Sequence, residues 1–90
     1  MTDAAPSRLV VEAVHKLSGR PWIFVSGTLE GGVVRIGDPV VVRTGTGPDV
    51  ETAVRTIELH GPPGKTTIAL DESLAGVVEP GIVLLVDRPL

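Results

Sequence analysis

The sequence predicts a single all-β domain whose short strands close into a small sandwich or barrel. Val, Ile and Thr together make up 28 of the 90 residues, and these branched side chains favour the pleated strand over the helix. The Gly and Pro residues, 11 and 8 in number, divide the chain into segments of about 8–12 residues, a spacing typical of sandwiches and barrels. Closing the sheet would also cover the edges that valine-rich strands otherwise expose.

We expect a flexible N-terminal segment over residues 1–7 and one barrel domain over residues 8–90. Within the domain, aliphatic runs bounded by turn residues predict the strands, and no run has the apolar repeat of a substantial helix. The expected strands are 8–17, 22–30, 33–36, 40–43, 51–60, 66–70, 75–78 and 82–87.

Alternation along the first two strands predicts which side chains share a face. The first strand is expected to place Leu9, Val11, Ala13 and Leu17 on one face, with Glu12 and Lys16 on the other. The second is expected to place Ile23, Val25 and Leu29 on one face, with Trp22, Phe24, Ser26 and Thr28 on the other.

Glycine-containing turns separate these strands. Gly31-Gly32 predicts a two-residue hairpin with positive φ at both centres, and Gly37 is expected to have a positive φ as well. Residues 44–49 predict a flexible loop, and Asp71-Glu72-Ser73 a turn.

The composition excludes several classes of site. The chain has no Cys, which excludes disulfides, iron–sulfur clusters and thiolate zinc sites. It has no Asn or Gln to read adenine edges, and its net charge of −3 argues against non-specific nucleic-acid binding. The longest apolar run, residues 82–86, is far shorter than a membrane span, so we expect a cytoplasmic protein that does not bind membranes.

Several motifs together resemble the second domain of elongation factor Tu and related translation GTPases. They are Val11-Glu12-Ala13-Val14, Ser18-Gly19-Arg20, the segment 25–32, the segment 33–38, and the ending Glu79-Pro80-Gly81-Ile82-Val83-Leu84. The resemblance covers about three-quarters of the chain. It implies a closed Greek-key barrel of about six strands, present here as a stand-alone domain without the GTPase domain.

The resemblance also implies where a site would lie. In elongation factor Tu this barrel helps to hold the aminoacyl end of tRNA, with an acidic pair and an aromatic residue in the first strand. Here Glu12 matches one acid, Ala13 replaces the second, and His15 replaces the aromatic residue.

Motifs for nucleotide, metal or catalytic chemistry are weak. The segment 61–67 resembles a phosphate loop, but Leu59 stands where the first Gly is required, so we expect no nucleotide site. His15 and His60 lack metal-ligand spacing, and Ser26 lacks a nucleophile motif. We therefore expect no cofactor, no metal and no catalytic residues.

Trp22 and Phe24 are the main candidate for a binding surface. Because the aliphatic residues of their strand should point inward, the two aromatics would form an exposed apolar patch beside Arg20. Such a patch anchors protein partners or a second copy of the chain, and it can also stack on bases. Alternatively, the terminal segments cover these aromatics as a small satellite core.

The sequence thus predicts a non-enzymatic binding or adaptor module, and the resemblance implies an association with translation or a ribonucleoprotein. The alternative is a self-associating structural protein that uses the Trp22–Phe24 face. A weaker hypothesis is an RNA-contacting module with His15, Arg20 and Lys65 at phosphates. The candidate binding residues are Glu12, His15, Arg20, Trp22, Phe24 and Lys65.

Overall fold

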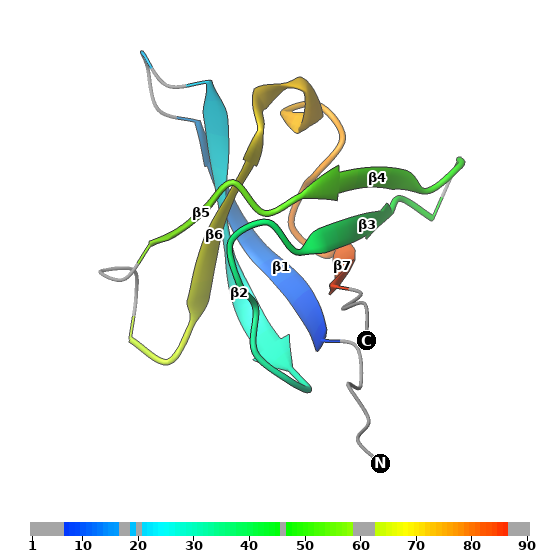
Figure 1. The fold of residues 1–90 in the computed structure, drawn as a ribbon. Helices are drawn as coiled ribbons and strands as arrows, with labels where there is room; N and C mark the ends of the chain where they lie inside the picture. Colours follow the sequence, from blue (N-terminus) through cyan, green and yellow to red (C-terminus); the bar gives the residue numbers. More distant parts are fainter. Residues whose placement is uncertain (1–6, 17–18, 20, 46, 59–62, 87–90) are drawn as a thin grey trace.

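The computed structural model describes residues 7–16, 19, 21–45, 47–58 and 63–86 (Figure 1). Within these residues, seven strands form one antiparallel sheet in the order β4-β3-β7-β1-β2-β6-β5. The strands are β1 (Ser7–Lys16), β2 (Trp22–Glu30), β3 (Pro39–Arg43), β4 (Val50–Ala53), β5 (Thr56–Glu58), β6 (Thr66–Asp71) and β7 (Val83–Val86). A single turn of 3-10 helix, η1 (Glu72–Leu74), follows β6, and the described part of the chain has no helix long and apolar enough to cross a membrane.

The sheet curls into a half-barrel around an aliphatic core. Alternate residues of five strands point inward, so the buried core draws two side chains from each of β1, β2, β3, β6 and β7. The core residues Leu9, Val11, Ile23, Val25, Val40, Val42, Val54, Ile68, Leu70, Leu74, Val78, Leu84 and Val86 are all buried. The all-β class and the burial of Ile23 and Val25 confirm the expectation from the sequence.

The curled sheet is open, which corrects the expectation of a closed barrel. Its two edges are β4 and β5, which are joined by Val54 and Arg55. The predicted strand 51–60 is divided at this point. The Val54 amide donates to the Asp38 oxygen (3.0 Å), whereas the Arg55 amide donates to the Ala69 oxygen (2.8 Å). The chain therefore leaves β3 and joins β6 between two consecutive residues.

A bulge in β1 changes the predicted faces of that strand. Val11 pairs with Gly27 and Ala13 pairs with Ser26, so Glu12 is an extra residue without its own partner in β2. Beyond the bulge, the alternation is shifted by one position. Val14, not Ala13, packs against the core, so the prediction that Ala13 points inward was wrong.

The predicted strand 33–36 is absent, and so is the hairpin before it. Gly31 has a positive φ of 97°, but Gly32 does not, so the chain turns away from β2 without forming a two-residue hairpin. The segment is held by the bond from the Ser7 hydroxyl to the Val33 oxygen (3.3 Å). The positive φ at Gly37, 92°, agrees with the prediction.

The predicted strand 75–78 was also wrong. Asp71 begins η1 by accepting a hydrogen bond from the Ser73 amide (2.9 Å), so the expected turn at 71–73 is part of a helical turn. The amides of Val77 and Val78 then donate to the Leu74 oxygen, at 2.9 and 3.0 Å. These local bonds place Val78 in the core without any strand pairing.

Candidate functional site

The outer face of β1, β2 and β6 carries most of the binding residues predicted from the sequence. Residues paired in register across antiparallel strands point to the same side of the sheet. His15 pairs with Phe24, and Phe24 pairs with Ala69, so all three lie on the face opposite the buried Ile23 and Val25. The structure thus brings His15 of β1 directly beside Phe24 of β2.

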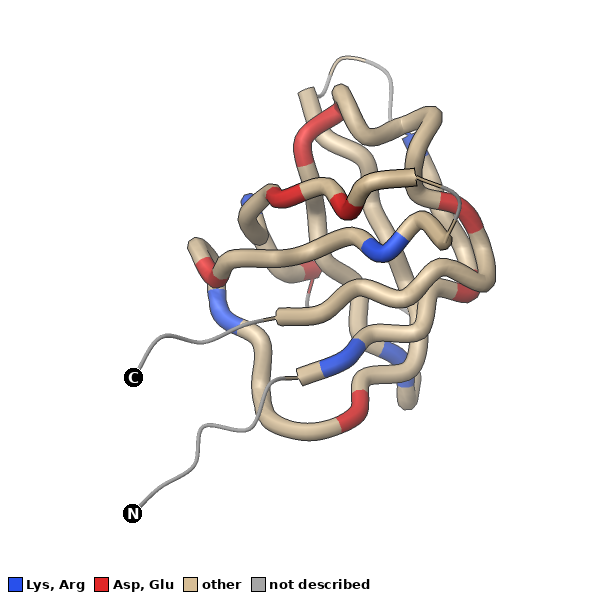
Figure 2. Tube along the Cα trace, turned by 90° about the vertical axis from the view of Figure 1, so that its right-hand side faces the viewer, with Lys and Arg blue, Asp and Glu red and all other residues tan. Residues whose placement is uncertain are grey.

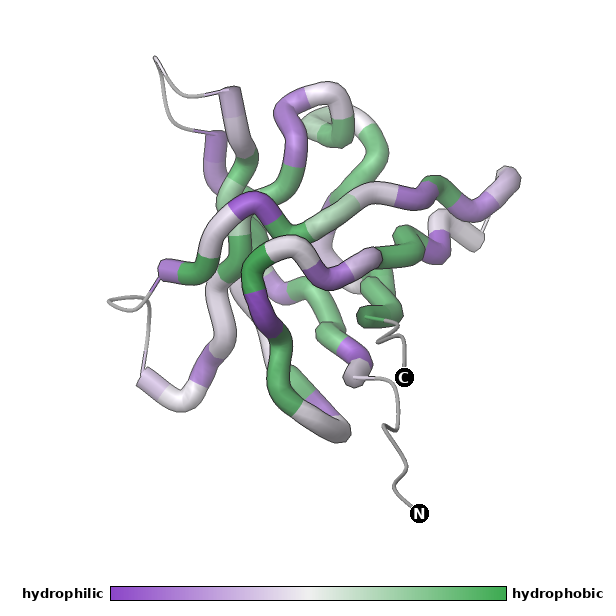
Figure 3. Tube along the Cα trace, in the orientation of Figure 1, coloured by the Kyte–Doolittle hydropathy of each residue, from purple (hydrophilic) through white to green (hydrophobic). Residues whose placement is uncertain are grey.

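Trp22 continues this face towards the end of β2. It pairs with Asp71 of β6 and, like Phe24, is half-buried. The two aromatics are therefore less exposed than the predicted open patch. Among the described residues, the large hydrophobics with the greatest exposure are instead Val33 and Ile36, at 55% and 63%, in the green β2–β3 connection of Figure 3.

A charged network lies on the same outer face, where the bulge turns Glu12 outward. The Lys65 ammonium donates to the Glu12 carboxylate over 2.9 Å, and the Thr28 hydroxyl donates to the same oxygen over 2.7 Å. Lys65 also donates to Thr28 over 3.3 Å, which closes a triangle of polar groups. The hydrogen bond from Lys65, and then that from Thr28, hold the pKa of Glu12 below its ordinary value of 4.5.

A buried hydroxyl pair lies between the network and the aromatic row. The Ser26 and Thr67 hydroxyls are 2.7 Å apart, and the two residues pair in register between β2 and β6. Each satisfies the other, so these polar groups hold β2 and β6 together beneath the site.

The far end of the face is fixed by Asp71. Its carboxylate accepts from the Ser73 amide and lies 3.3 Å from the Arg55 guanidinium. The hydrogen bonds from Ser73, with a smaller effect of Arg55, lower the pKa of this carboxyl. Trp22 therefore lies beside an ionised group that is already neutralised locally.

The structure leaves part of the prediction outside its described residues. Arg20 and His60 fall there, as do residues 61 and 62 of the phosphate-loop-like segment. Among the residues that are described, no group of three or more His, Asp or Glu could hold a metal ion. The arrangement of Glu12, Lys65, His15 and Phe24 offers charge, hydrogen bonding and an aromatic surface, which are the elements of a recognition face.

Sequence reasoning missed a second surface, on the outer face of β1, β7 and β3. Arg8 and Arg43 border an open groove of about 670 Å³ there. Charge alternation along β1 was visible in the sequence, but the pairing of β7 between β1 and β3, which brings the two arginines to one surface, was not.

In comparisons with known proteins, no family model and no curated protein sequence matches the chain.

Proposed function

We propose that this protein is a non-enzymatic binding module with the fold of the second domain of elongation factor Tu-like GTPases, associated with translation or a ribonucleoprotein. The strand order supports this fold. Residues 50–58 pair first with β3 and then with β6, so one continuous stretch supplies both edge strands of the open, curled sheet. A curled antiparallel sheet with this strand order is in keeping with the barrel-like fold that the resemblance in sequence implies.

Gly27 gives the second line of support for this fold. A Cβ at Gly27 would overlap the main-chain oxygen of Val10, so only glycine allows β1 to pass this close at the bulge. Gly27 belongs to one of the segments that carry the resemblance, and it has a demanding structural role there.

The recognition face consists of Glu12, His15, Trp22, Phe24 and Lys65, and we propose that it binds a protein partner. The observation that carries this proposal is the pairing of His15 with Phe24 on the same face as the Glu12–Lys65 ion pair. Half-buried aromatics next to fixed polar groups are typical of the energetic centres of protein interfaces. Lysines and arginines are interspersed with acidic residues over the molecule (Figure 2), which favours a protein partner over an RNA backbone.

Capture of partners from native lysate tests this face. Phe24→Ala should lose the captured partner, because truncating an interface centre costs about 2 kcal/mol or more, roughly a thirtyfold loss of affinity. Ile36→Ala removes an apolar side chain that is 63% exposed outside the face, and it should retain the partner. Retention by both variants would contradict the proposed face.

Two measurements distinguish the alternative occupants of the face. Trp22 is the only tryptophan, so its fluorescence reports binding directly. If the face binds a second copy, light scattering will show a mass that rises with concentration in the wild type but not in Phe24→Ala. If it binds RNA, titration with tRNA or single-stranded RNA will change the fluorescence, and raising the salt will weaken the effect.

A further inference from the structure

The groove on the outer face of β1, β7 and β3 has an aliphatic floor. Leu85 of β7 pairs with Arg8 of β1 and with Val41 of β3, and Val83 pairs with Val10 and with Arg43. All six side chains therefore point to the same side of the sheet. Val83 and Leu85 lie in the middle and are only partly buried, although β7 lies between β3 and β1 in the sheet.

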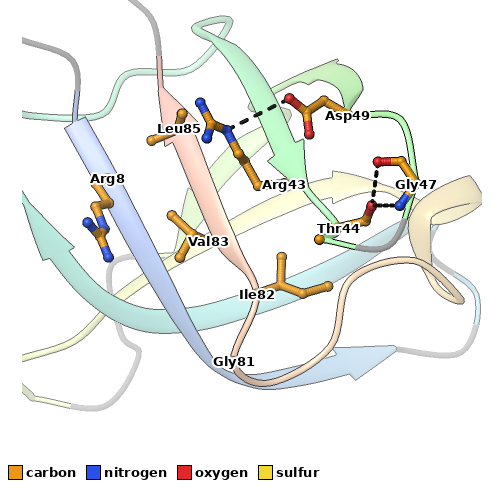
Figure 4. Close-up of a pocket in the computed structure, with 10 residues that line it drawn as sticks. Arg8, Arg43, Thr44, Gly47, Asp49, Gly81, Ile82, Val83 and Leu85 are labelled. Atoms are coloured by element: carbon orange, nitrogen blue, oxygen red, sulfur yellow. Dashed lines mark hydrogen bonds and ion pairs between the residues drawn. The ribbon is translucent and has the colours of Figure 1, made fainter.

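Two cationic side chains, those of Arg8 and Arg43, lie on opposite sides of these aliphatic residues. Figure 4 shows the side chains of Val83 and Leu85 between those of Arg8 and Arg43. The arginine side chains are 53% and 60% exposed. Each has an acidic neighbour, Glu30 and Asp49 respectively, but both nitrogen–oxygen distances are 3.8 Å, which is too long for a hydrogen bond. Within the described part of the chain, both guanidinium groups thus retain most of their donors for a ligand.

The rim of the groove contains two glycines without side chains, and hydrogen bonds hold part of it. Gly45 and Gly81 border it, and a Cβ at either position would meet no atom within 4 Å, so open space lies above them. In the described part of the β3–β4 connection, where the sequence predicts a flexible loop, the Thr44 hydroxyl accepts from the Gly47 amide (3.2 Å) and donates to the Gly47 oxygen (3.3 Å). A ligand would therefore find an accessible surface that is already formed.

We propose that this groove binds an extended segment of a partner protein with the pattern acidic–x–aliphatic–x–acidic. Arg8 and Arg43 are two strands apart across the sheet and two residues apart along it, which separates their Cα atoms by about 12 Å diagonally. In an extended peptide, residues i and i+4 are about 13 Å apart and point to the same side. Their carboxylates meet the two arginines, and the aliphatic residue at i+2 packs on Val83 and Leu85.

The occupant is a different protein rather than a second copy of this chain. Nowhere in the 90-residue sequence are two acidic residues separated by four positions, so the chain does not contain the required pattern. The floor is aliphatic and has no aromatic ring on which a base could stack, which argues against single-stranded RNA. This surface shares no residue with the recognition face, and the proposal does not depend on that face.

Titration with blocked synthetic peptides, followed by amide NMR shifts of the full chain, tests the groove. The probe is acetyl-Ser-Glu-Ser-Leu-Ser-Glu-Ser-amide, which has the proposed spacing. The control is acetyl-Ser-Ser-Glu-Leu-Glu-Ser-Ser-amide, with the same composition but with acids that point away from the leucine side. We expect the probe to shift the amides of Arg8, Arg43, Val83 and Leu85 and to bind roughly five- to tenfold more tightly than the control, as two exposed ion pairs would give.

Substitutions in and near the groove should weaken peptide binding at two positions and strengthen it at a third. Arg8→Gln and Arg43→Gln should each weaken probe binding about threefold, because each removes one exposed ion pair. Asp49→Asn should strengthen binding about twofold, since it removes the carboxylate nearest to Arg43, and a damaged fold would not produce a gain. Lys16→Gln removes a cation that does not line this groove and should leave binding unchanged.

Equal binding of the two peptides would overturn the proposal, as would shifts confined to His15 and Phe24. Absence of binding by the probe at millimolar concentration would overturn it as well. None of these results would affect the recognition face, which is tested by Phe24→Ala.

Discussion

Glu12 has its outward position because β1 contains one residue more than β2 at the bulge. The extra residue lets Glu12 reach Lys65 and Thr28 while Val11 and Val14, on either side, both face the core. The sequence indicated that Glu12 lies on the outer side, through simple alternation. It did not indicate the partner, because Lys65 is 53 positions away and a local pattern carries no information about such a contact.

The ion pair of Glu12 makes the folded state sensitive to acid. Its pKa is lower in the folded chain than the ordinary 4.5, so its contribution to stability is present above pH 4.5 and is lost as pH falls through the folded value. Lys65→Met should therefore raise the pKa of the Glu12 carboxyl and flatten the loss of stability below pH 4.5. Carboxyl NMR titration measures the first effect, and urea unfolding at several pH values measures the second. Arg35→Met removes a cation that does not contact Glu12 and serves as the control.

Gly27 is the residue at which a single methyl group should be most damaging. Gly27→Ala would drive a Cβ into the Val10 main chain, and we expect a loss of about 3 kcal/mol or an unfolded protein. Gly76→Ala is the matched control, since a Cβ there meets no atom within 4 Å, and its stability should change by less than about 0.5 kcal/mol. Urea denaturation compares the two, and similar stabilities would show that the bulge is absent.

At the scale of elements, strands with regular alternation were predicted well. Strands β2, β3, β6 and β7 fall within one or two residues of their expected ranges. The segments 33–36 and 75–78 have similar β-branched composition but are not strands. In both, short-range hydrogen bonds decide the conformation. The Arg35 amide donates to the Asp38 carboxylate (2.8 Å), and the Val77 amide to the Leu74 oxygen, so local geometry overrides strand propensity.

The strand β7 offers a direct test of the two faces that the structure assigns to the sheet. Leu84 is fully buried, whereas its neighbour Leu85 lies on the outer groove and is only partly covered. Leu84→Ala should cost about 3 kcal/mol of unfolding free energy. Leu85→Ala should cost about 1 kcal/mol or less, because most of the cavity term is missing there. Thermal or urea unfolding of both variants gives the comparison, and equal losses would contradict the assigned faces.

For the whole molecule, the all-β class followed from composition, whereas the degree of closure did not. Whether a curled sheet closes depends on how the stretch from 50 to 58 divides its hydrogen bonds between β3 and β6. That choice is set at Val54 and Arg55 by contacts with Asp38 and Ala69, which are distant in the sequence. Likewise, His15 and Phe24 were both candidates, but their direct pairing required the register of β1 and β2.

The same distant pairing determines how the chain should fold. The strand β1 pairs with β7, and β2 with β6, so large loops must close before these ladders form. We expect refolding over milliseconds to seconds, slower than helical proteins of this length. Stopped-flow dilution from urea, with Trp22 fluorescence as the signal, measures the rate. A microsecond phase that accounts for the whole amplitude would contradict this expectation.

The pairing of Ser7 with Val86 has a mechanical consequence. Both ends of the described chain leave the sheet at one corner (Figure 1). Domains whose ends lie close together tolerate insertion into a loop of another protein, because the two ends of that loop need not be moved apart. A pulling force applied at these two residues would load the hydrogen bonds between β1 and β7 one after another instead of all together. Such an arrangement unzips at low tension, in contrast to ladders that are sheared along their length.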